Sequence, residues 1–278
     1  MQEVDIKVLQ PIYAELHASG VFSSNCQLVE IIGGAVNKSY QLIDNQRRYF
    51  VKIFSPDELG GIDRRQQFLR QKELAKLGLA PQPCYLSNKH QFQVDDWVEG
   101  QSLLDEQVDV AHKYRQLARS LLRIHKLGNT PILNFLPLDL PQKWQEYIAI
   151  AKLKLSAAEQ LNISQWTDIW YSADNANHGS NSCVCHNDLS LQHVLLSPSE
   201  VIFDWEYAAF SNRYFDIASS LLVNTASIEC EQILLLEYAN LSDLPLARVI
   251  SQVGLMKPLV EFTNKLWFMA ADKQASLN

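Results

Sequence analysis

The chain of 278 residues lacks a long apolar run and an excess of basic side chains. No stretch approaches the ~20 apolar residues of a membrane-spanning helix, and the opening MQEVDIKVLQPIYAEL lacks the basic and apolar segments of a signal peptide. Lys and Arg number 24 against 31 Asp and Glu, a formal charge of -7, whereas a nucleic-acid surface needs a basic excess. We therefore expect a cytoplasmic protein with no membrane or nucleic-acid partner, and its oligomeric state stays open.

Cysteine is also scarce and scattered. The five residues are Cys26, Cys84, Cys183, Cys185 and Cys230. An odd, dispersed set is typical of reduced thiols and not of a disulfide framework. The C-x-C pair has no second Cys or His pair at zinc-site spacing, so we expect it to fill a strand as small apolar residues.

What is present divides into two parts, beginning with a β-rich first third. β-branched and aromatic residues between turn-formers predict strands at 26–32, 38–44, 47–54, 83–87 and 92–98. A helix is expected from Arg64, ended by Gly78 and Pro81. The sequence thus predicts an N-terminal lobe, residues 1–98, made of a five-stranded antiparallel sheet with one main helix.

The second part, residues 99–278, is predicted to be mostly helical. Amphipathic patterns cover 111–128 and 141–161, a polar loop occupies 172–182, and the tail from Ile228 again has helical periodicity. Together the two parts predict an α+β bilobal protein with a cleft between the lobes.

Two carboxylates stand near each other late in the sequence. HNDLSLQHVLL and VIFDWEY place Asp188 on a loop and Asp204 after a strand, a turn and a second strand. Such carboxylates repel unless a proton or a divalent cation lies between them. Mg²⁺ accepts one or two carboxylates together with phosphate oxygens. The pair therefore indicates phosphoryl transfer or, taken alone, metal-dependent hydrolysis of a phosphate ester.

A lysine interrupts an apolar strand in YFVKIF. Lys52 needs a counter-charge there if it is buried, and Glu73 on the following helix is the expected partner. The alternative is that Lys52 points to solvent from an edge strand.

In this order, the segments resemble those of the aminoglycoside phosphotransferase and choline kinase family, which includes bacterial thiamine kinases. HNDLSLQHVLL and VIFDWEYAAFSNRYFDIAS carry the resemblance. IIGGAVNKSY is similar to the family's phosphate-covering hairpin, YFVKIF to its lysine strand, RQKELAKLGLAP to its paired helix and LARSLLRIH to a helix of its second lobe. The resemblance implies a protein-kinase-like fold and a phosphotransferase that uses ATP and Mg²⁺ on an alcohol.

The resemblance also implies residue roles. Asp188 matches the catalytic aspartate that accepts or orients the hydroxyl proton, Asp204 matches the metal-binding aspartate, and His186 matches a bracing residue of the loop. GGAVNKSY lacks the spacing of a P-loop but resembles a hairpin that covers phosphates, and VDDWVEG resembles the adenine-binding connection between lobes. The residues expected around the nucleotide are Gly33, Gly34, Asn37, Ser39, Lys52, Glu73, Asp95, Trp97 and Val98.

One residue departs from the family pattern. His193 stands where the family has a metal-binding asparagine. An imidazole suits Mn²⁺ or Zn²⁺ better than Mg²⁺, so His193 is expected either to contact the metal or only to hold the loop. Glu206, two residues after Asp204, could join the metal or meet a cationic substrate. Asp216 is expected to be structural, as a helix N-cap or a brace of the catalytic loop.

The acceptor follows from the resemblance and the aromatic residues. Choline and thiamine are cationic alcohols, which aromatic faces and carboxylates bind well. The segment EFTNKLWFMAADKQ resembles the aromatic terminal helix of their kinases, and the candidate substrate residues are Trp205, Glu206, Tyr207, Trp267 and Phe268. The alternatives are an aminoglycoside acceptor and, because of His193, a non-catalytic nucleotide-binding pseudokinase.

Overall fold

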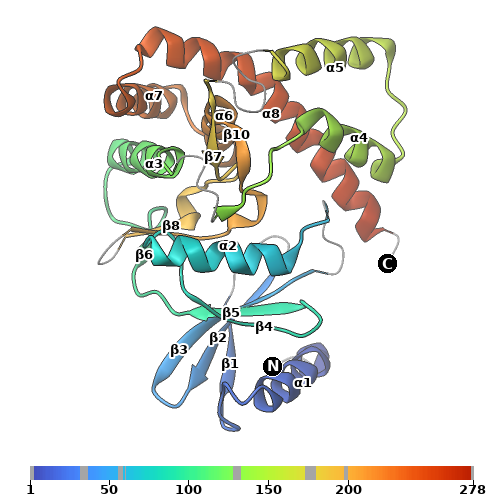
Figure 1. Cartoon of the computed structure of the whole chain (residues 1–278), viewed down its shortest axis with the longest axis vertical. Coiled ribbons are helices and arrows are strands. Elements are labelled where there is room, and N and C mark those ends of the chain that lie inside the picture. Colours follow the sequence, from blue (N-terminus) through green and yellow to red (C-terminus); the bar gives the residue numbers. More distant parts are fainter. Residues whose placement is uncertain are drawn as a thin grey trace.

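The computed structural model shows two lobes stacked along the long axis of the molecule (Figure 1). It describes residues 3–31, 37–55, 59, 61–127, 133–172, 180–196 and 200–276. The first lobe carries the larger sheet and the second carries most of the helices. The predicted α+β bilobal architecture is confirmed.

The N-terminal lobe is built on a five-stranded antiparallel sheet in the order β1-β2-β3-β5-β4. Its strands are β1 Gln27–Ile31, β2 Lys38–Asp44, β3 Arg47–Ile53, β4 Pro83–Leu86 and β5 Phe92–Asp96. Ser39, Lys52 and Gln93 are paired across β2, β3 and β5. Since directly paired residues share a face of a sheet, these three polar side chains form one row.

Two helices accompany this sheet. α2, Arg64–Lys76, is the predicted helix, and the side chain of Asp63 caps it by accepting from the Gln66 N–H. α1, Glu3–Ala18, was not predicted from the sequence, because Pro11 lies inside it and interrupts the helical pattern. α1 buries Leu9, Ile12 and Leu16 in the core of this lobe.

A short connection leads to the second lobe. After β5 the chain passes through Gly100, whose φ of 141° favours glycine, and enters β6, Gln101–Ser102. β6 pairs with β8, Val194–Leu196, which pairs with β9, Glu200–Ile202. The chain is thus attached to the second lobe's own sheet directly after the connection.

The C-terminal lobe surrounds its β-strands with helices (Figure 1). The helices are α3 Val110–His125, α4 Leu140–Ala151, α5 Ala157–Trp170, α6 Arg213–Val223, α7 Ile228–Ser242 and α8 Leu246–Ala275. β7, Ser182–Cys185, pairs with β10, Ala209–Asn212. The predicted helix over 141–161 is two helices, since Lys152 adopts a left-handed φ of 52° and Ser156 starts α5 with a capping box.

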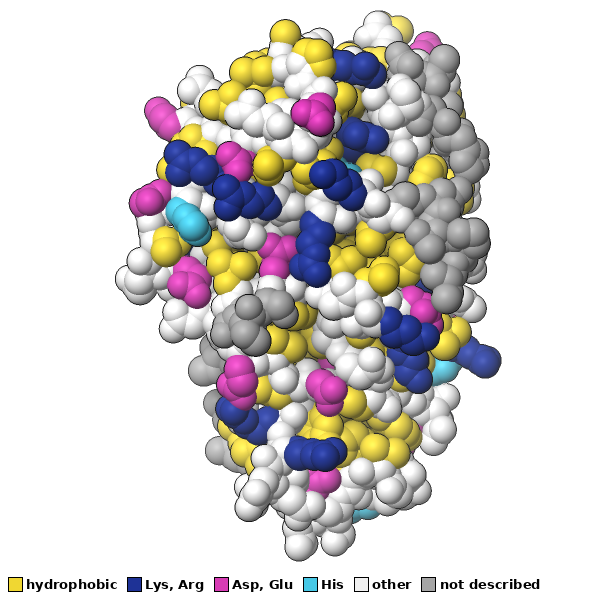
Figure 2. Space-filling view, turned by 60° about the vertical axis from the view of Figure 1, so that its left-hand side comes forward, with side chains coloured by type: hydrophobic (Ala, Val, Ile, Leu, Met, Phe, Trp, Pro, Cys, Tyr) yellow, Lys and Arg dark blue, Asp and Glu magenta, His cyan; other side chains and the backbone are white. Residues whose placement is uncertain are grey.

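The mixed charges of the surface and the unpaired cysteines agree with the expectations from composition. Figure 2 shows a face on which Lys and Arg side chains lie among acidic and apolar ones, and charges of this kind are paired in Arg119–Glu237. All five cysteines are free, and the C-x-C pair is buried on β7. Among the described helices, none has both the length and the apolar character to cross a membrane.

Candidate active site

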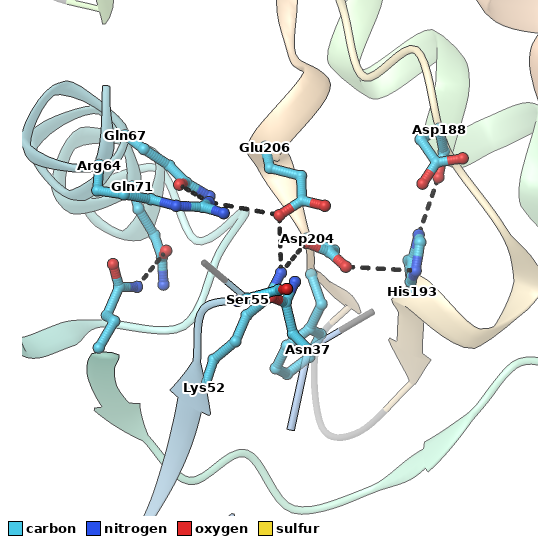
Figure 3. Close-up of polar contacts among 12 residues, drawn as sticks. Asn37, Lys52, Ser55, Arg64, Gln67, Gln71, Asp188, His193, Asp204 and Glu206 are labelled. Carbon is cyan, nitrogen blue, oxygen red and sulfur yellow. Dashed lines mark hydrogen bonds and ion pairs between the residues drawn. The ribbon is translucent and has the colours of Figure 1, made fainter. Parts of the chain in front are cut away.

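Three of the predicted residues, Lys52, Asp188 and Asp204, lie where the two lobes face each other (Figure 3). Lys52 comes from β3, Asp188 follows β7, and Asp204 follows β9. The β8–β9 hairpin turns the chain back between the two aspartates. The strand-turn-strand arrangement inferred from their spacing therefore delivers both carboxylates to one region.

The loop that carries Asp188 is fixed by α6. The Asp216 carboxylate accepts hydrogen bonds from the backbone N–H groups of His186 and Asn187 at 2.9 and 2.7 Å. It also contacts His125 Nε2 at 3.0 Å. Of its two predicted structural roles, Asp216 takes the brace and not the N-cap, which is Asn212.

Three further side chains of the α6 region extend this brace, and the sequence analysis did not identify them. Ser219 Oγ donates to the carbonyl of Asn187 at 2.8 Å, and Ser220 Oγ to that of Leu189 at 2.7 Å. The amide of Asn224 also donates to the Leu189 carbonyl, at 3.2 Å. The helical pattern of 213–223 gave no signal for them, because small polar residues in a buried helix are compatible with simple packing.

His186 lies in the position of a brace. Its Nε2–H donates to the carbonyl of Phe203 at 2.9 Å, just before Asp204, and its ring packs against those of His193 and Trp205. Burial and the neighbouring His193 lower the pKa of His186 to about 4. The ring is therefore neutral at physiological pH and links the two aspartate segments.

Asp188 has the electrostatic environment of a proton acceptor. Burial raises the pKa of its carboxyl to about 7, and the nearby carboxylates of Asp204 and Glu206 act in the same direction. Its carboxyl group has no hydrogen-bond donor among the described residues. The group can therefore accept a hydrogen bond from an incoming hydroxyl.

Asp204 occupies an unusual backbone conformation. Its φ of 64° and ψ of 54° lie in the left-handed region, at the start of the 3₁₀ turn Trp205–Tyr207. Oδ1 accepts from Lys52 Nζ at 2.6 Å. Burial disfavours the charged form, but Lys52 and His193 outweigh it, and the pKa of Asp204 is lowered. The carboxylate therefore stays ionised.

His193 faces Asp204 with its second nitrogen. Nδ1 lies 2.9 Å from the backbone carbonyl of Asp188 and 3.4 Å from the backbone nitrogen of Ser190; in the neutral tautomer that donates to the closer carbonyl, Nε2 is the unprotonated nitrogen. Nε2 lies 3.8 Å from Asp204 Oδ2 (Figure 3). Two donor atoms at this separation fit a shared divalent cation, so these residues are compatible with both predicted roles of His193, metal contact and loop support.

Lys52 has different partners from those predicted. Its Nζ donates to Asp204 at 2.6 Å and to Glu206 Oε2 at 3.0 Å. Burial opposes its charge, but these two carboxylates prevail, and the pKa of Lys52 is raised. Glu73 is not its partner: that carboxylate binds Lys76 one turn further along α2, at 2.7 Å. The expectation of a Lys52–Glu73 pair was wrong.

The nucleotide-binding residues predicted around the first hairpin are only partly within the described residues. Gly33 and Gly34 lie outside the described residues. Asn37 Oδ1 accepts from the backbone N–H of Ser55 at 2.9 Å and so ties the start of β2 to the end of β3. Ser39 is half-buried beside Lys52 in the polar row of the sheet.

The connection between the lobes contains the other predicted nucleotide residues. Asp95 is buried at the end of β5 and accepts from Gln93 at 2.7 Å. Burial raises the pKa of Asp95 to about 7. Trp97 and Val98 follow it, half-buried, and the Arg48 guanidinium lies 5.6 Å from the Trp97 ring centroid.

Two of the aromatic candidates do not face the site. Trp205 is only 6% exposed, and its indole N–H donates to the Ile202 carbonyl at 2.9 Å. It is a core residue and not a substrate contact, because the 3₁₀ turn directs it inward. Phe268 is 54% exposed, on the outer side of α8.

The other aromatic residues gather near Asp188. Burial raises the pKa of the Tyr207 hydroxyl, and Glu206, Tyr147 and Asp188 raise it further; the nearby Trp267 indole lowers it, although its N–H makes no hydrogen bond of acceptable geometry to a described residue. All four are therefore within electrostatic range of that hydroxyl. Tyr147, on α4, was missed because it fits the apolar periodicity of a core helix; it is 6% exposed. Tyr207 and Trp267, both half-buried, form what we call the aromatic group, whereas Tyr147 packs in the core behind them.

A buried His125–Cys183–Cys185 cluster also has the composition of a metal site, with ligand atoms within 4.8 Å of one another. Both nitrogens of His125 are already engaged, Nδ1 with the Tyr238 hydroxyl at 2.7 Å and Nε2 with Asp216. The histidine is therefore committed to the brace behind the catalytic loop.

Comparison with known proteins supplies context for this geometry. Residues 27–248 match the family described as "Phosphotransferase enzyme family". The protein LicA of Haemophilus influenzae is 23% identical over 213 residues, which cover 75% of this chain and 62% of that relative. The chain thus spans less than two thirds of this curated relative.

Solved structures share the fold. Choline kinase LicA from Streptococcus pneumoniae superimposes with a TM-score of 0.73 at 18% identity, covering 96% of this chain and 92% of that one. An aminoglycoside-3'-phosphotransferase of type VIII gives a TM-score of 0.63 at 20% identity, covering 90% and 98%. At this level of identity the likeness describes the fold, and it agrees with the resemblance found in the sequence.

Proposed function

Since the chain belongs to the phosphotransferase enzyme family, we propose that it transfers the γ-phosphate of ATP to the hydroxyl of a small cationic alcohol, with choline or thiamine as the leading candidates. The observation that carries this proposal is a site in which Lys52 is paired with Asp204 and Asp188 lies within electrostatic range of Tyr207. It combines a proton acceptor for a hydroxyl with π faces for a cation.

Each residue of the site has a separate part in this reaction. Asp188 accepts a hydrogen bond from the acceptor hydroxyl and orients its oxygen. Lys52 supplies positive charge for the nucleotide phosphates. Asp204, with His193, would hold a divalent cation, which when bound neutralises charge on the phosphates.

A cationic alcohol suits this site better than a polycationic aminoglycoside. Tyr207 and Trp267, both half-buried, offer ring faces, each worth about 0.5–2 kcal/mol to a cation. The carboxylate closest to them in sequence, Glu206, is already bound to Lys52 and Arg64. The pseudokinase alternative is disfavoured because Lys52, Asp188 and Asp204 are all present in one region and Lys52 is paired with Asp204.

The proposed reaction also bears on location. ATP and five free thiols suit the reducing cytoplasm, which we therefore retain as the proposed compartment.

The test is a panel of acceptors in which charge and shape are separated. We would measure ADP release and the mass of the product with choline, thiamine, kanamycin, and 3,3-dimethylbutanol, the neutral isostere of choline. A phosphorylated cationic alcohol, with the neutral isostere at least about tenfold slower, is expected from the loss of cation–π attraction. Equal rates for choline and its isostere would refute cation recognition, and a phosphorylated aminoglycoside alone would replace the proposed acceptor.

A further inference from the structure

The face of α2 that is turned toward the site carries no carboxylate. The buried residues of this helix are Arg64, Gln67, Gln71 and Leu74. Its one acidic residue, Glu73, is paired with the exposed Lys76. The counter-charge that Lys52 requires in a buried position therefore comes from outside α2.

Glu206, in the other lobe, supplies a counter-charge to two cations at once. Its Oε2 atom accepts from Lys52 Nζ at 3.0 Å and from Arg64 Nη1 at 3.4 Å (Figure 3). The exposed fractions of these side chains are 9% for Glu206, 15% for Lys52 and 6% for Arg64. Removing one partner of such a shielded contact costs more than removing one partner of an exposed ion pair, because a buried charge is left uncompensated.

Arg64 is itself fixed. Its Nη1 donates to Gln67 Oε1, one turn along α2. Its guanidinium carbon lies 3.9 Å from the ring centroid of Phe54, a cation–π contact. Glu206 thus binds the Arg64 guanidinium, which Gln67 and Phe54 hold in place.

We infer that Glu206 is a positioning residue that orients Lys52 toward the nucleotide phosphates, and that Arg64 acts through Glu206. This inference rests on the proposed function. Asp204 and Glu206 then have separate tasks: Asp204 turns to the divalent cation, and Glu206 keeps hold of Lys52. This assignment differs from both sequence-based expectations for Glu206, the metal shell and a cationic substrate.

The test uses the full chain with ATP as the probe, in Mg²⁺ and again in EDTA. Glu206→Gln is expected to raise the Kd for ATP about tenfold under both conditions, the scale of a lost charged hydrogen bond. Arg64→Gln should raise it less, through a loosened Glu206. The matched control is Glu73→Gln, which removes an α2 carboxylate that does not touch Lys52 and should leave the Kd unchanged.

The double variant separates positioning from simple stability. Glu206→Gln alone leaves Lys52 and Arg64 with only Asp204, whereas Arg64→Gln with Glu206→Gln restores one cation to one carboxylate. We expect its Tm to recover part of the loss while its Kd for ATP stays as weak as in Glu206→Gln. A Kd that recovers together with Tm would show a purely structural role and overturn the inference.

Three other results would also overturn it. An effect of Glu206→Gln that appears in Mg²⁺ but not in EDTA would make Glu206 a metal ligand. An unchanged Kd in Glu206→Gln, with a wild-type protein that phosphorylates an alcohol, would refute the inference alone. A wild-type protein that binds no ATP would refute the proposed function and this inference together.

Discussion

The two sides of the site, the loop that carries Asp188 and the strand that carries Lys52, are held in position by different kinds of interaction. The loop that carries Asp188 is fixed through its backbone, by buried donors and acceptors of α6 such as Asp216 and Ser220. The backbone of Lys52 is held in β3, but its ammonium group is positioned by carboxylates that belong to the other lobe. We expect the hydrogen bonds that hold the Asp188 loop to remain when ligands bind. The ion pairs of Lys52, in contrast, can be replaced: Lys52 can bind a phosphate and its carboxylate partners can bind a metal ion.

The largest expected effect is a loss of kcat on substitution of Asp188. Asp188→Asn keeps the shape of the side chain but removes the charge that accepts the hydroxyl proton, so kcat should fall about 10²- to 10⁴-fold. The Kd for ATP, measured by calorimetry, should stay within about twofold of wild type, since ATP would bind through the other side. An undiminished kcat would remove Asp188 from the chemistry.

The next test breaks the brace itself. Asp216→Asn removes a fully buried charge that serves two backbone N–H groups and His125, and we expect about 3 kcal/mol of destabilisation in a denaturant titration. Residual folded enzyme should lose kcat with little change in the KM for ATP. Asp272→Asn, an exposed position on α8, is the matched control. Equal stability of the two variants would show that the brace contributes little.

Substitution of Lys52, on the other side of the site, should change the KM for ATP more than kcat. Lys52→Ala should raise the KM for ATP about tenfold or more, because the phosphates lose a charged hydrogen bond. The control is Lys265→Ala, which removes an exposed lysine paired with Glu159 and should be nearly silent. If Lys52→Ala retained the wild-type KM and kcat for ATP, the first lobe would have been misinterpreted.

The smallest effect is expected at His193, which belongs to both sides through Asp188 and Asp204. If Nε2 contacts the metal, His193→Asn should shift the ratio of Mg²⁺- to Mn²⁺-supported activity a few-fold toward Mg²⁺, because an amide oxygen is the harder ligand. An unaltered ratio would leave His193 as a support of the loop only.

The parts of this arrangement that could be predicted were those with local signals. The strands of the first lobe alternate visibly between turn residues, and Lys52, Asp188 and Asp204 lie in short motifs. The partner of Lys52 could not be predicted in this way. The buried residues of α2 are Arg64, two glutamines and Leu74, so hydrophobic periodicity does not mark the inward face, and the resemblance of RQKELAKLGLAP to a paired helix favoured Glu73 instead.

Long-range contacts account for the other omissions. Tyr147, a core residue of α4, raises the pKa of Tyr207, and nothing in its own segment indicates that it lies near the site. α1 was missed because a proline inside a helix opposes the local prediction, and burial of Leu16 against the sheet provides a tertiary compensation that no local pattern shows.

The left-handed backbone conformation at position 204 restricts which amino acids fit there, and this restriction is stricter than the need for a negative charge alone. Besides glycine, asparagine and aspartate are the residues that enter this region at low cost, and of these three only aspartate carries a carboxylate. Glutamate, the usual conservative replacement, would keep the charge but oppose the backbone. The amino acid at position 204 is thus selected twice, once by the ion that it can bind and once by the turn that it must make.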